Sequence, residues 1–143
     1  MGVSTAFPTQ TFRWNYSGTI LSLGELNGDG VVDIFSGNHG YDALPFPGEI
    51  GTLMLSSGGK LVNASASLPQ NPTFTHSVAG NDVDGDGDTD LLVGVLGYYD
   101  GGAYILRNDG EGNFTRDSAA LPEFIRAGWH MEGRFTAAHF AVA

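Results

Sequence analysis

The chain has 143 residues, of which 41% are hydrophobic, so it is long and apolar enough to fold around a core of its own. Its formal net charge of -10, with only six Lys and Arg, argues against a nucleic-acid partner, which needs clustered basic residues. There are no cysteines, which excludes disulfides and thiolate metal sites, and no apolar run approaches membrane-spanning length.

Residues 1–16 precede a repeated unit. Between Met1 and Trp14 there is no basic segment followed by an apolar stretch, so this N-terminus is not typical of a signal peptide. We expect residues 1–16 to complete a neighbouring unit of the repeat, and any secretion leader to lie outside this sequence.

Residues 17–73 are the first copy of the repeated unit. Four short runs rich in Val, Ile, Leu, Phe and Thr are separated by clusters of Gly, Asp and Asn, which is the pattern of short strands joined by turns. We expect these strands at residues 19–23, 31–35, 52–55 and 61–66.

The loop between the first two expected strands carries oxygen-bearing groups at alternate positions. Acidic or amide side chains stand at positions 1, 3, 5 and 9 of this loop, and a backbone carbonyl stands at position 7. Calcium takes about six to eight oxygen ligands in irregular geometry, so a short loop of this kind suits it. The candidate ligands are Glu25, Asn27, Asp29, the carbonyl of Val31, and Asp33.

Residues 74–134 are the second copy, with strands expected at residues 74–79, 90–95, 103–107 and 114–119. Residues 135–143 look like the start of a third copy, and they stop one residue before the next candidate ligand would appear.

The first two copies differ in length. Glu25 and Asp82 are 57 residues apart, whereas we pair Leu55 with Leu106 at an offset of 51. The first copy therefore has six extra residues, which we place within residues 42–50.

Four strands per unit and a period above fifty residues favour a propeller blade over a sandwich. The sequence predicts an all-β fold of about two and a half β-propeller blades, each of four antiparallel strands. A closed ring has about four to eight blades, so we expect further blades, either from the same parent chain or from copies of this chain in a homo-oligomer.

The loop of the second copy has the stronger metal-binding pattern. Aspartates stand at positions 1, 3, 5 and 9, and Gly85 and Gly87 let the backbone wrap around an ion. The alternative is a solvated acidic turn, but repulsion among five carboxylates favours a bound cation. The candidate ligands are Asp82, Asp84, Asp86, Asp88 through its carbonyl, and Asp90.

Calcium suits these loops better than the other ions we considered. Magnesium demands near-ideal octahedral geometry, and zinc and copper prefer nitrogen or sulfur ligands. An EF-hand begins with the same spacing but needs a Glu at position 12 and a helix on each side. Position 12 is Ser36 in one copy and Val93 in the other, and strands are expected on both sides, so we reject an EF-hand.

The two loops resemble those of the FG-GAP/VCBS repeat family, which includes the integrin α-subunit propeller and many secreted bacterial proteins. The residues that carry the resemblance are Glu25–Asp33, Asp82–Asp90 and Arg107–Thr115. It implies structural calcium in the loop between the first two strands of a blade, and an extracellular or periplasmic location. The sequence departs from the family pattern at Glu25, which replaces Asp, and at Ser56–Gly59, which replaces a longer Asn-Asp-Gly turn.

We expect no enzymatic activity. Histidines 39, 76, 130 and 139 are scattered without a metal-binding spacing, and the clustered carboxylates lie in loops suited to holding a cation together.

The resemblance implies a lectin-like or adhesion module that binds a glycan or a protein. In related propellers the ligand lies on the face opposite the calcium loops. The candidate ligand-binding residues there are Tyr41, Phe46, Tyr98, Tyr99, Trp129 and His130, and the alternative is that they pack between blades. Two other functions stay open: a non-catalytic fragment or accessory domain of a larger secreted polysaccharide lyase or hydrolase, and a self-assembling structural subunit.

Overall fold

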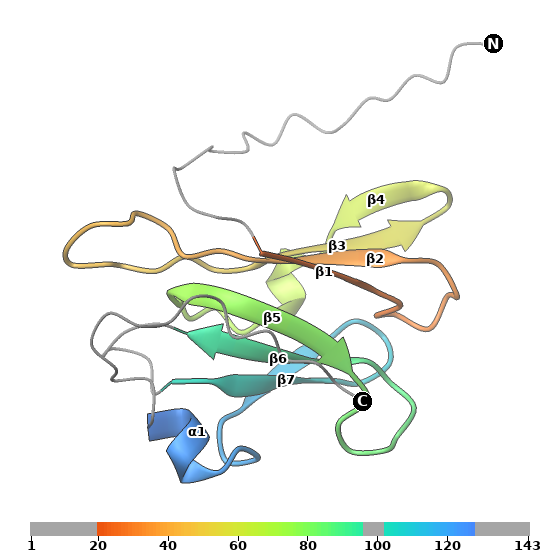
Figure 1. Cartoon of the computed structure of the whole chain (residues 1–143). Helices are drawn as coiled ribbons and strands as arrows, with labels where there is room; N and C mark the ends of the chain where they lie inside the picture. Colours follow the sequence, from red (N-terminus) through yellow and green to blue (C-terminus); the bar gives the residue numbers. More distant parts are fainter. Residues whose placement is uncertain (1–19, 96–101, 128–143) are drawn as a thin grey trace.

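Runs of β-branched and large apolar residues, closed by Gly, Asp or Asn, form the strands of the computed structural model, which describes residues 20–95 and 102–127 (Figure 1). The first sheet consists, in chain order, of β1 (Ile20–Gly24), β2 (Asp33–Gly37), β3 (Thr52–Ser57) and β4 (Lys60–Asn63). The second consists, again in chain order, of β5 (Thr75–Asn81), β6 (Asp90–Val95), β7 (Tyr104–Asn108) and β8 (Phe114–Asp117).

All neighbouring strands in both sheets are antiparallel, so each sheet is a four-stranded meander of the kind expected for a propeller blade. The described helices are a 3-10 helix at Ser65–Ser67 and the short α1 (Glu123–Ala127). The prediction of an all-β fold with four antiparallel strands in each unit is confirmed.

The expected strands are all present, most of them with bounds that differ by one to three residues, and two of these differences have a visible local reason. β2 begins at Asp33 and not at Val31, because the Val31 amide donates a 2.8 Å hydrogen bond to the Asp29 carboxylate and still belongs to the loop. β4 ends at Asn63, because its side-chain oxygen accepts a 2.9 Å bond from the Ser65 amide and so starts the 3-10 helix.

The strand registers correct the predicted alignment of the two copies. Ile34 pairs with Met54 in the first sheet, and Leu91, which lies 57 residues after Ile34, pairs with Leu106 in the second. The equivalent of Leu106 is therefore Met54, at an offset of 52, and not Leu55. The first copy has five extra residues before its third strand instead of six. The apolar run allowed either pairing, and only the cross-strand partners distinguish them.

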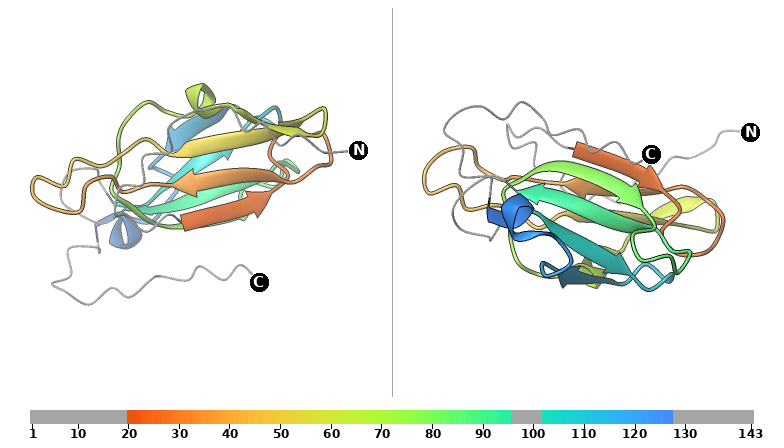
Figure 2. Two further views of the ribbon diagram at one scale, coloured as in Figure 1. Left: turned by 90° about the horizontal axis from the view of Figure 1, so that it is seen from above. Right: turned by 60° about the horizontal axis from the view of Figure 1, so that its bottom comes forward.

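The two sheets lie face to face as two layers, and the core fills the space between them (Figures 1 and 2). The first sheet contributes Phe35 and Leu53, and the second contributes Leu91, Val93 and Leu106, all of them buried. Burying one such side chain contributes roughly 1.5–3 kcal/mol, so this shared layer holds the two sheets together. The other members of the core are Leu26, Leu68, Phe74, Val95, Tyr104 and Phe114.

The sheets use opposite faces in this contact. In the second sheet, Leu91 faces the first sheet. In the first sheet, Phe35 faces the core, and neighbouring residues of a strand lie on opposite faces, so Ile34, the equivalent of Leu91, lies on the outer face. Ile34 shares this outer face with the cross-strand partners Met54 and Leu23, and Leu23 is 67% exposed. The outer face of the first sheet is therefore apolar and partly open to solvent.

Residues 1–19, 96–101 and 128–143 lie outside the described part of the chain. The expected roles of residues 1–16 and 135–143, and the borders between the copies, stay predictions.

Candidate metal centre

Both acidic loops leave their sheets at the same end, the β1–β2 loop from the first sheet and the β5–β6 loop from the second (Figure 1). In the second loop Gly85 and Gly87 have φ of 83° and 98°, a region that residues with a Cβ rarely adopt. These two positions require glycine, and they let the chain curl so that alternate side chains point the same way.

Three of the predicted ligands converge. Asp82, Asp84 and Asp86 each offer a carboxylate oxygen within 4.8 Å of the other two, and they are the one such acidic group in residues 20–95 and 102–127. Calcium–oxygen distances are about 2.3–2.6 Å, so one ion can touch oxygens up to about 5 Å apart. The spacing of the three oxygens therefore fits a calcium-sized ion.

The loop's own amides hold this arrangement. The two oxygens of Asp82 accept hydrogen bonds from the amides of Gly85 (2.7 Å) and Gly87 (3.0 Å), and Asp86 accepts one from the amide of Asp88 (2.9 Å). Such local bonds fix the turn while leaving further lone pairs on the carboxylates.

The aspartate at position 9, Asp90, also fastens the loop to its sheet. Asp90 is fully buried and lies outside the group of three, at the base of the loop. One of its oxygens accepts a 3.1 Å bond from the Val83 amide and the other a 2.9 Å bond from the Asn108 amide. Asp33 is equally buried in the first sheet. Both residues fasten the start of a loop to the third strand of its own sheet.

The side chain of Asp88, predicted to contribute only its carbonyl, adds to the negative charge of the loop. Its carboxylate lies against Gly110 in the turn between β7 and β8. Desolvation, and then the negative charges of Asp86, Asp82 and other nearby aspartates, raise the pKa of Asp88 above its ordinary value. A cation bound beside these carboxylates would relieve that repulsion.

The first loop is organised differently. Glu25 accepts hydrogen bonds from the amides of Asn27 and Gly28, and Asp29 accepts a 2.9 Å bond from the Ser56 hydroxyl. Asn27 in turn donates from its side chain to the Ser56 carbonyl at 3.3 Å. The loop is thus tied to β3 by neutral donors, and the structure gathers its acidic side chains into no group of three.

Arg107, on β7, begins a stretch that carries the family resemblance, but it was not predicted to be a residue of this site. One guanidinium nitrogen lies 2.9 Å from Asp84 and 3.2 Å from Asp90, and another lies 3.6 Å from Asp117 on β8. A basic residue directly before Asn108, at the end of an otherwise apolar third strand, is the signal that could have found it. The corrected register makes Leu55 its equivalent in the first copy.

Asn108 links the two loops through buried hydrogen bonds. Its side-chain amide donates to the carbonyls of Leu26 (3.0 Å) and Thr89 (3.1 Å), while its backbone amide donates to Asp90. The Leu26 amide donates in turn to Asp33 at 2.7 Å. A continuous chain of hydrogen bonds therefore connects the buried aspartates of the two sheets.

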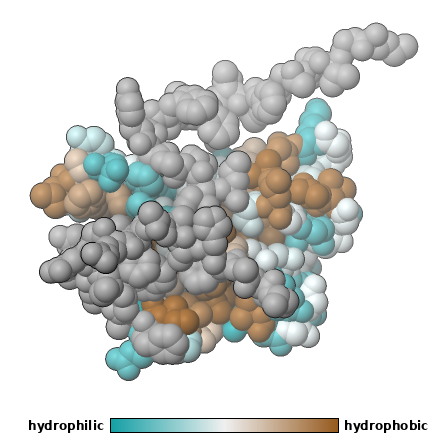
Figure 3. Space-filling view, viewed as in Figure 1, coloured by the Kyte–Doolittle hydropathy of each residue, from teal (hydrophilic) through white to brown (hydrophobic). Residues whose placement is uncertain are grey.

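The opposite end of the sheets carries two of the residues predicted to bind a ligand, Tyr41 and Phe46. In the β2–β3 connection, Tyr41 is 64% exposed, while Phe46 is 37% exposed and packs edge-on against Phe74, with ring centroids 5.3 Å apart. Hydrophobic side chains gather over the tip of this connection (Figure 3). The remaining predicted ligand-binding residues, Tyr98, Tyr99, Trp129 and His130, lie outside the described ranges.

Two histidines stack beneath these aromatic residues. The rings of His39 and His76 are 5.1 Å apart and nearly parallel, at 13°. Ring lone pairs lie in the ring plane, so two stacked rings do not both point at one metal ion. Burial, and then the neighbouring His39, lower the pKa of His76, while Asp42 acts in the opposite direction.

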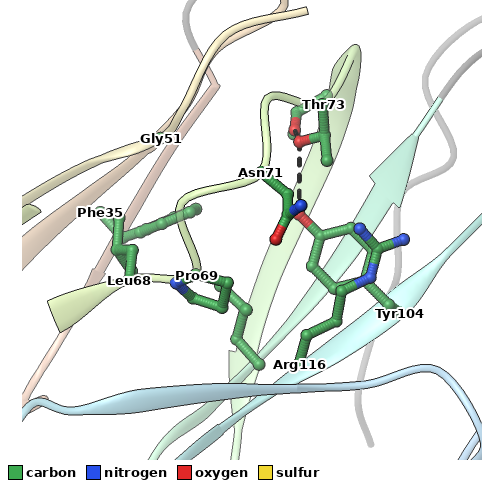
Figure 4. Close-up of a pocket in the computed structure, with 10 residues that line it drawn as sticks. Phe35, Gly51, Leu68, Pro69, Asn71, Thr73, Tyr104 and Arg116 are labelled. Atoms are coloured by element: carbon green, nitrogen blue, oxygen red, sulfur yellow. Dashed lines mark hydrogen bonds between the residues drawn. The ribbon is translucent and has the colours of Figure 1, made fainter. Parts of the chain in front are cut away.

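The cavity drawn in Figure 4 lies between the two sheets and has a volume of about 20 Å³. Phe35 lines it from the first sheet, and Tyr104 and Arg116 from the second. The Tyr104 hydroxyl lies 3.3 Å from that of Thr73, and the Arg116 guanidinium stands 3.9 Å above the Tyr104 ring. A space of this size admits about one water molecule and no organic substrate.

Replacing Asn108 with Ala should weaken the contact between the sheets. The variant leaves the Leu26 and Thr89 carbonyls without their side-chain donor, so we expect the free energy of unfolding to fall by roughly 1–3 kcal/mol. Urea unfolding measures this. Asn113→Ala is the control, because Asn113 is exposed in the β7–β8 turn that follows Asn108 and its side chain bonds to Asp109. Equal losses in both variants would contradict the role of Asn108.

The histidine pair predicts a pH dependence of stability. Because the folded pKa of His76 lies below its ordinary value of 6.5, the unfolded chain binds more protons in this range, and stability falls as the pH drops from about 7 through 6.5. His76→Gln should make the melting temperature depend less on pH between about pH 7 and pH 5.5. Asp42→Asn should make it depend more on pH, because Asp42 opposes the lowering of the His76 pKa. An unchanged profile in His76→Gln would contradict this assignment.

The comparisons with known proteins agree with the repeat. The FG-GAP-like repeat family matches residues 25–93 and 82–138, which together span more than half of the chain and begin 57 residues apart, the spacing of the two acidic loops. The chain is similar to integrin alpha-PS2 of Drosophila melanogaster, with 43% identity over 72 residues.

That similarity covers 43% of this chain and 5% of the integrin, so the chain spans only a small part of this curated relative. No solved structure gives a significant match. With its two four-stranded meanders and its pair of acidic loops, the chain belongs to the FG-GAP-like repeat family.

Proposed function

We propose that this chain is part of an extracellular calcium-binding β-propeller that serves recognition or adhesion, and that calcium has a structural role in the loop from Asp82 to Asp90. The observation that carries the proposal is the convergence of carboxylate oxygens from Asp82, Asp84 and Asp86 within 4.8 Å of one another. Membership of the FG-GAP-like repeat family and the similarity to an integrin α-chain support it.

The donor set fits a hard cation. Asp82, Asp84 and Asp86 supply only oxygen, which suits calcium and disfavours zinc or copper. When bound, calcium would neutralise the carboxylates and cross-link the loop. Asp90 and the carbonyl of Asp88 remain candidate ligands of the same ion, and the loop from Glu25 to Asp33 remains a weaker second site.

Recognition is a better proposal than catalysis for this chain. FG-GAP-like repeats are generally non-catalytic, and the relative is an integrin α-chain. Among the described residues no helix is long and apolar enough to cross a membrane. An extracellular or periplasmic setting accords with the relative and with millimolar calcium, at which weak sites are filled.

The outer face of the first sheet, with Leu23, Ile34 and Met54, supports the proposal that further blades pack on this chain. Ile34 and Met54 are equivalent to Leu91 and Leu106, which are covered in the second sheet by the first. A third sheet placed in the same way would cover them too. It would come from the same parent chain or from another copy of this chain.

Thermal unfolding with calcium and with EGTA tests whether calcium stabilises the loop from Asp82 to Asp90. A site with a Kd of about 10⁻⁴–10⁻³ M stabilises the protein by roughly 0.4–1.4 kcal/mol at about 1 mM calcium, so we expect a measurable rise in melting temperature. Asp86→Asn should remove most of it. Glu111→Gln, which removes an exposed charge from the neighbouring β7–β8 turn, should keep it.

Two further measurements on the same samples sharpen this result. Magnesium at equal concentration should give a smaller rise. The mass by light scattering distinguishes a homo-oligomer from a monomer that depends on further blades of a parent chain. No calcium-dependent change in the unsubstituted chain would refute structural calcium.

The exposed aromatic residues of the β2–β3 connection are the proposed recognition surface. Tyr41→Ala and Phe46→Ala should each reduce binding to whichever immobilised glycan or extracellular-matrix protein retains the chain, by about tenfold or more for a residue at the centre of the contact. Val62→Ala is the control, since Val62 is also exposed but lies on β4. Binding that neither aromatic variant reduces would refute this surface.

A further inference from the structure

Arg107 places a fixed positive charge inside the acidic loop of the second sheet. Its side chain is 24% exposed and contacts Asp84 at 2.9 Å and Asp90 at 3.2 Å with the same nitrogen. A second nitrogen reaches Asp117, 3.6 Å away on β8. The guanidinium thus bridges position 3 and position 9 of the loop and anchors both to the sheet.

The first sheet has no counterpart of this charge. The registers place Leu55 at the equivalent position, where it packs against the core. The carboxylate of Asp29 receives the neutral Ser56 hydroxyl instead, at 2.9 Å. Two loops with the same ligand spacing therefore differ in charge: the second has two more aspartates, Asp84 and Asp88, and among the described residues it alone has a basic side chain directly beside its carboxylates.

That charge acts on the loop in two opposite ways. When the loop holds no other cation, Arg107 offsets the repulsion among its aspartates and pins Asp84 and Asp90 in place. When a divalent cation approaches Asp84, the guanidinium repels it and competes for the same carboxylate. The contact of Arg107 with Asp84 and Asp90 therefore stabilises the ion-free loop and also lowers the affinity of the loop for a divalent cation.

We propose that Arg107 is a built-in counter-cation of the loop from Asp82 to Asp90, which holds the loop when calcium is absent and lowers its affinity for calcium. The inference rests on the proposed calcium site and adds what sets the strength of that site. The loop from Glu25 to Asp33, without such a charge, lacks this competition.

Arg107→Leu, which copies the residue of the first sheet, tests the inference. We expect calcium to bind this variant roughly tenfold more tightly in isothermal titration calorimetry, because a repelling charge has been removed beside a divalent ion. In EGTA the same variant should melt at a lower temperature than the unsubstituted chain. Lys60→Met, which removes an exposed positive charge from the start of β4, should change neither quantity.

The possible results separate this inference from the proposed function. If the unsubstituted chain binds no calcium, the proposed site itself is wrong. If it binds calcium and Arg107→Leu binds equally or more weakly, Arg107 arranges the ligands and the competition is refuted. Should the leucine variant not fold, Arg107→Gln keeps a polar side chain at this partly exposed position, and tighter binding is again the result expected.

Discussion

The acidic end of this protein depends on two aspartates, Asp33 and Asp90, whose carboxylates are removed from water. An ionised carboxylate is costly to bury unless donors surround it, and each of these finds one amide at the start of its own loop and another on the third strand of its sheet. The need for these donors sets where each loop leaves its sheet. It also brings β3 within hydrogen-bonding distance of Asp33 and β7 within hydrogen-bonding distance of Asp90. The alternating side chains at the loop's rim are presented together because its base is held in this way.

The same constraint carries over from one sheet to the next. Asn108 uses its backbone amide for Asp90 and its side chain for the Leu26 carbonyl, and Leu26 is in turn bonded to Asp33. Burial of the shared apolar core, to which Phe35 and Leu106 belong, supplies the adhesion between the sheets, while these directional bonds define how one loop sits beside the other. A fold made of repeated units thus gains a specific contact at the end where its acidic loops meet.

The two loops share their ligand spacing but not their electrostatics. In the first, Glu25 and Asp29 are satisfied by amides and by the Ser56 hydroxyl, all of them neutral donors. In the second, a larger negative charge is balanced in part by Arg107. Because a cation responds to the whole local charge and not to the spacing alone, equivalent loops in one chain are expected to respond differently to calcium.

The sequence by itself determined the all-β class, the strands of both copies to within a few residues, and the convergence of Asp82, Asp84 and Asp86, because apolar alternation, glycine turns and loop spacing are local properties. The tertiary structure decided the rest. Only the cross-strand registers make Met54 the equivalent of Leu106, and therefore Leu55 the equivalent of Arg107. The burial of Asp90 below the rim and the bond from Asn108 to Leu26 depend on groups brought together from distant parts of the chain, 82 positions apart in the second case. No pattern within a single loop or strand specifies such contacts, because each of them forms only when folding buries both partners together, and the bond between them then offsets the cost of their desolvation.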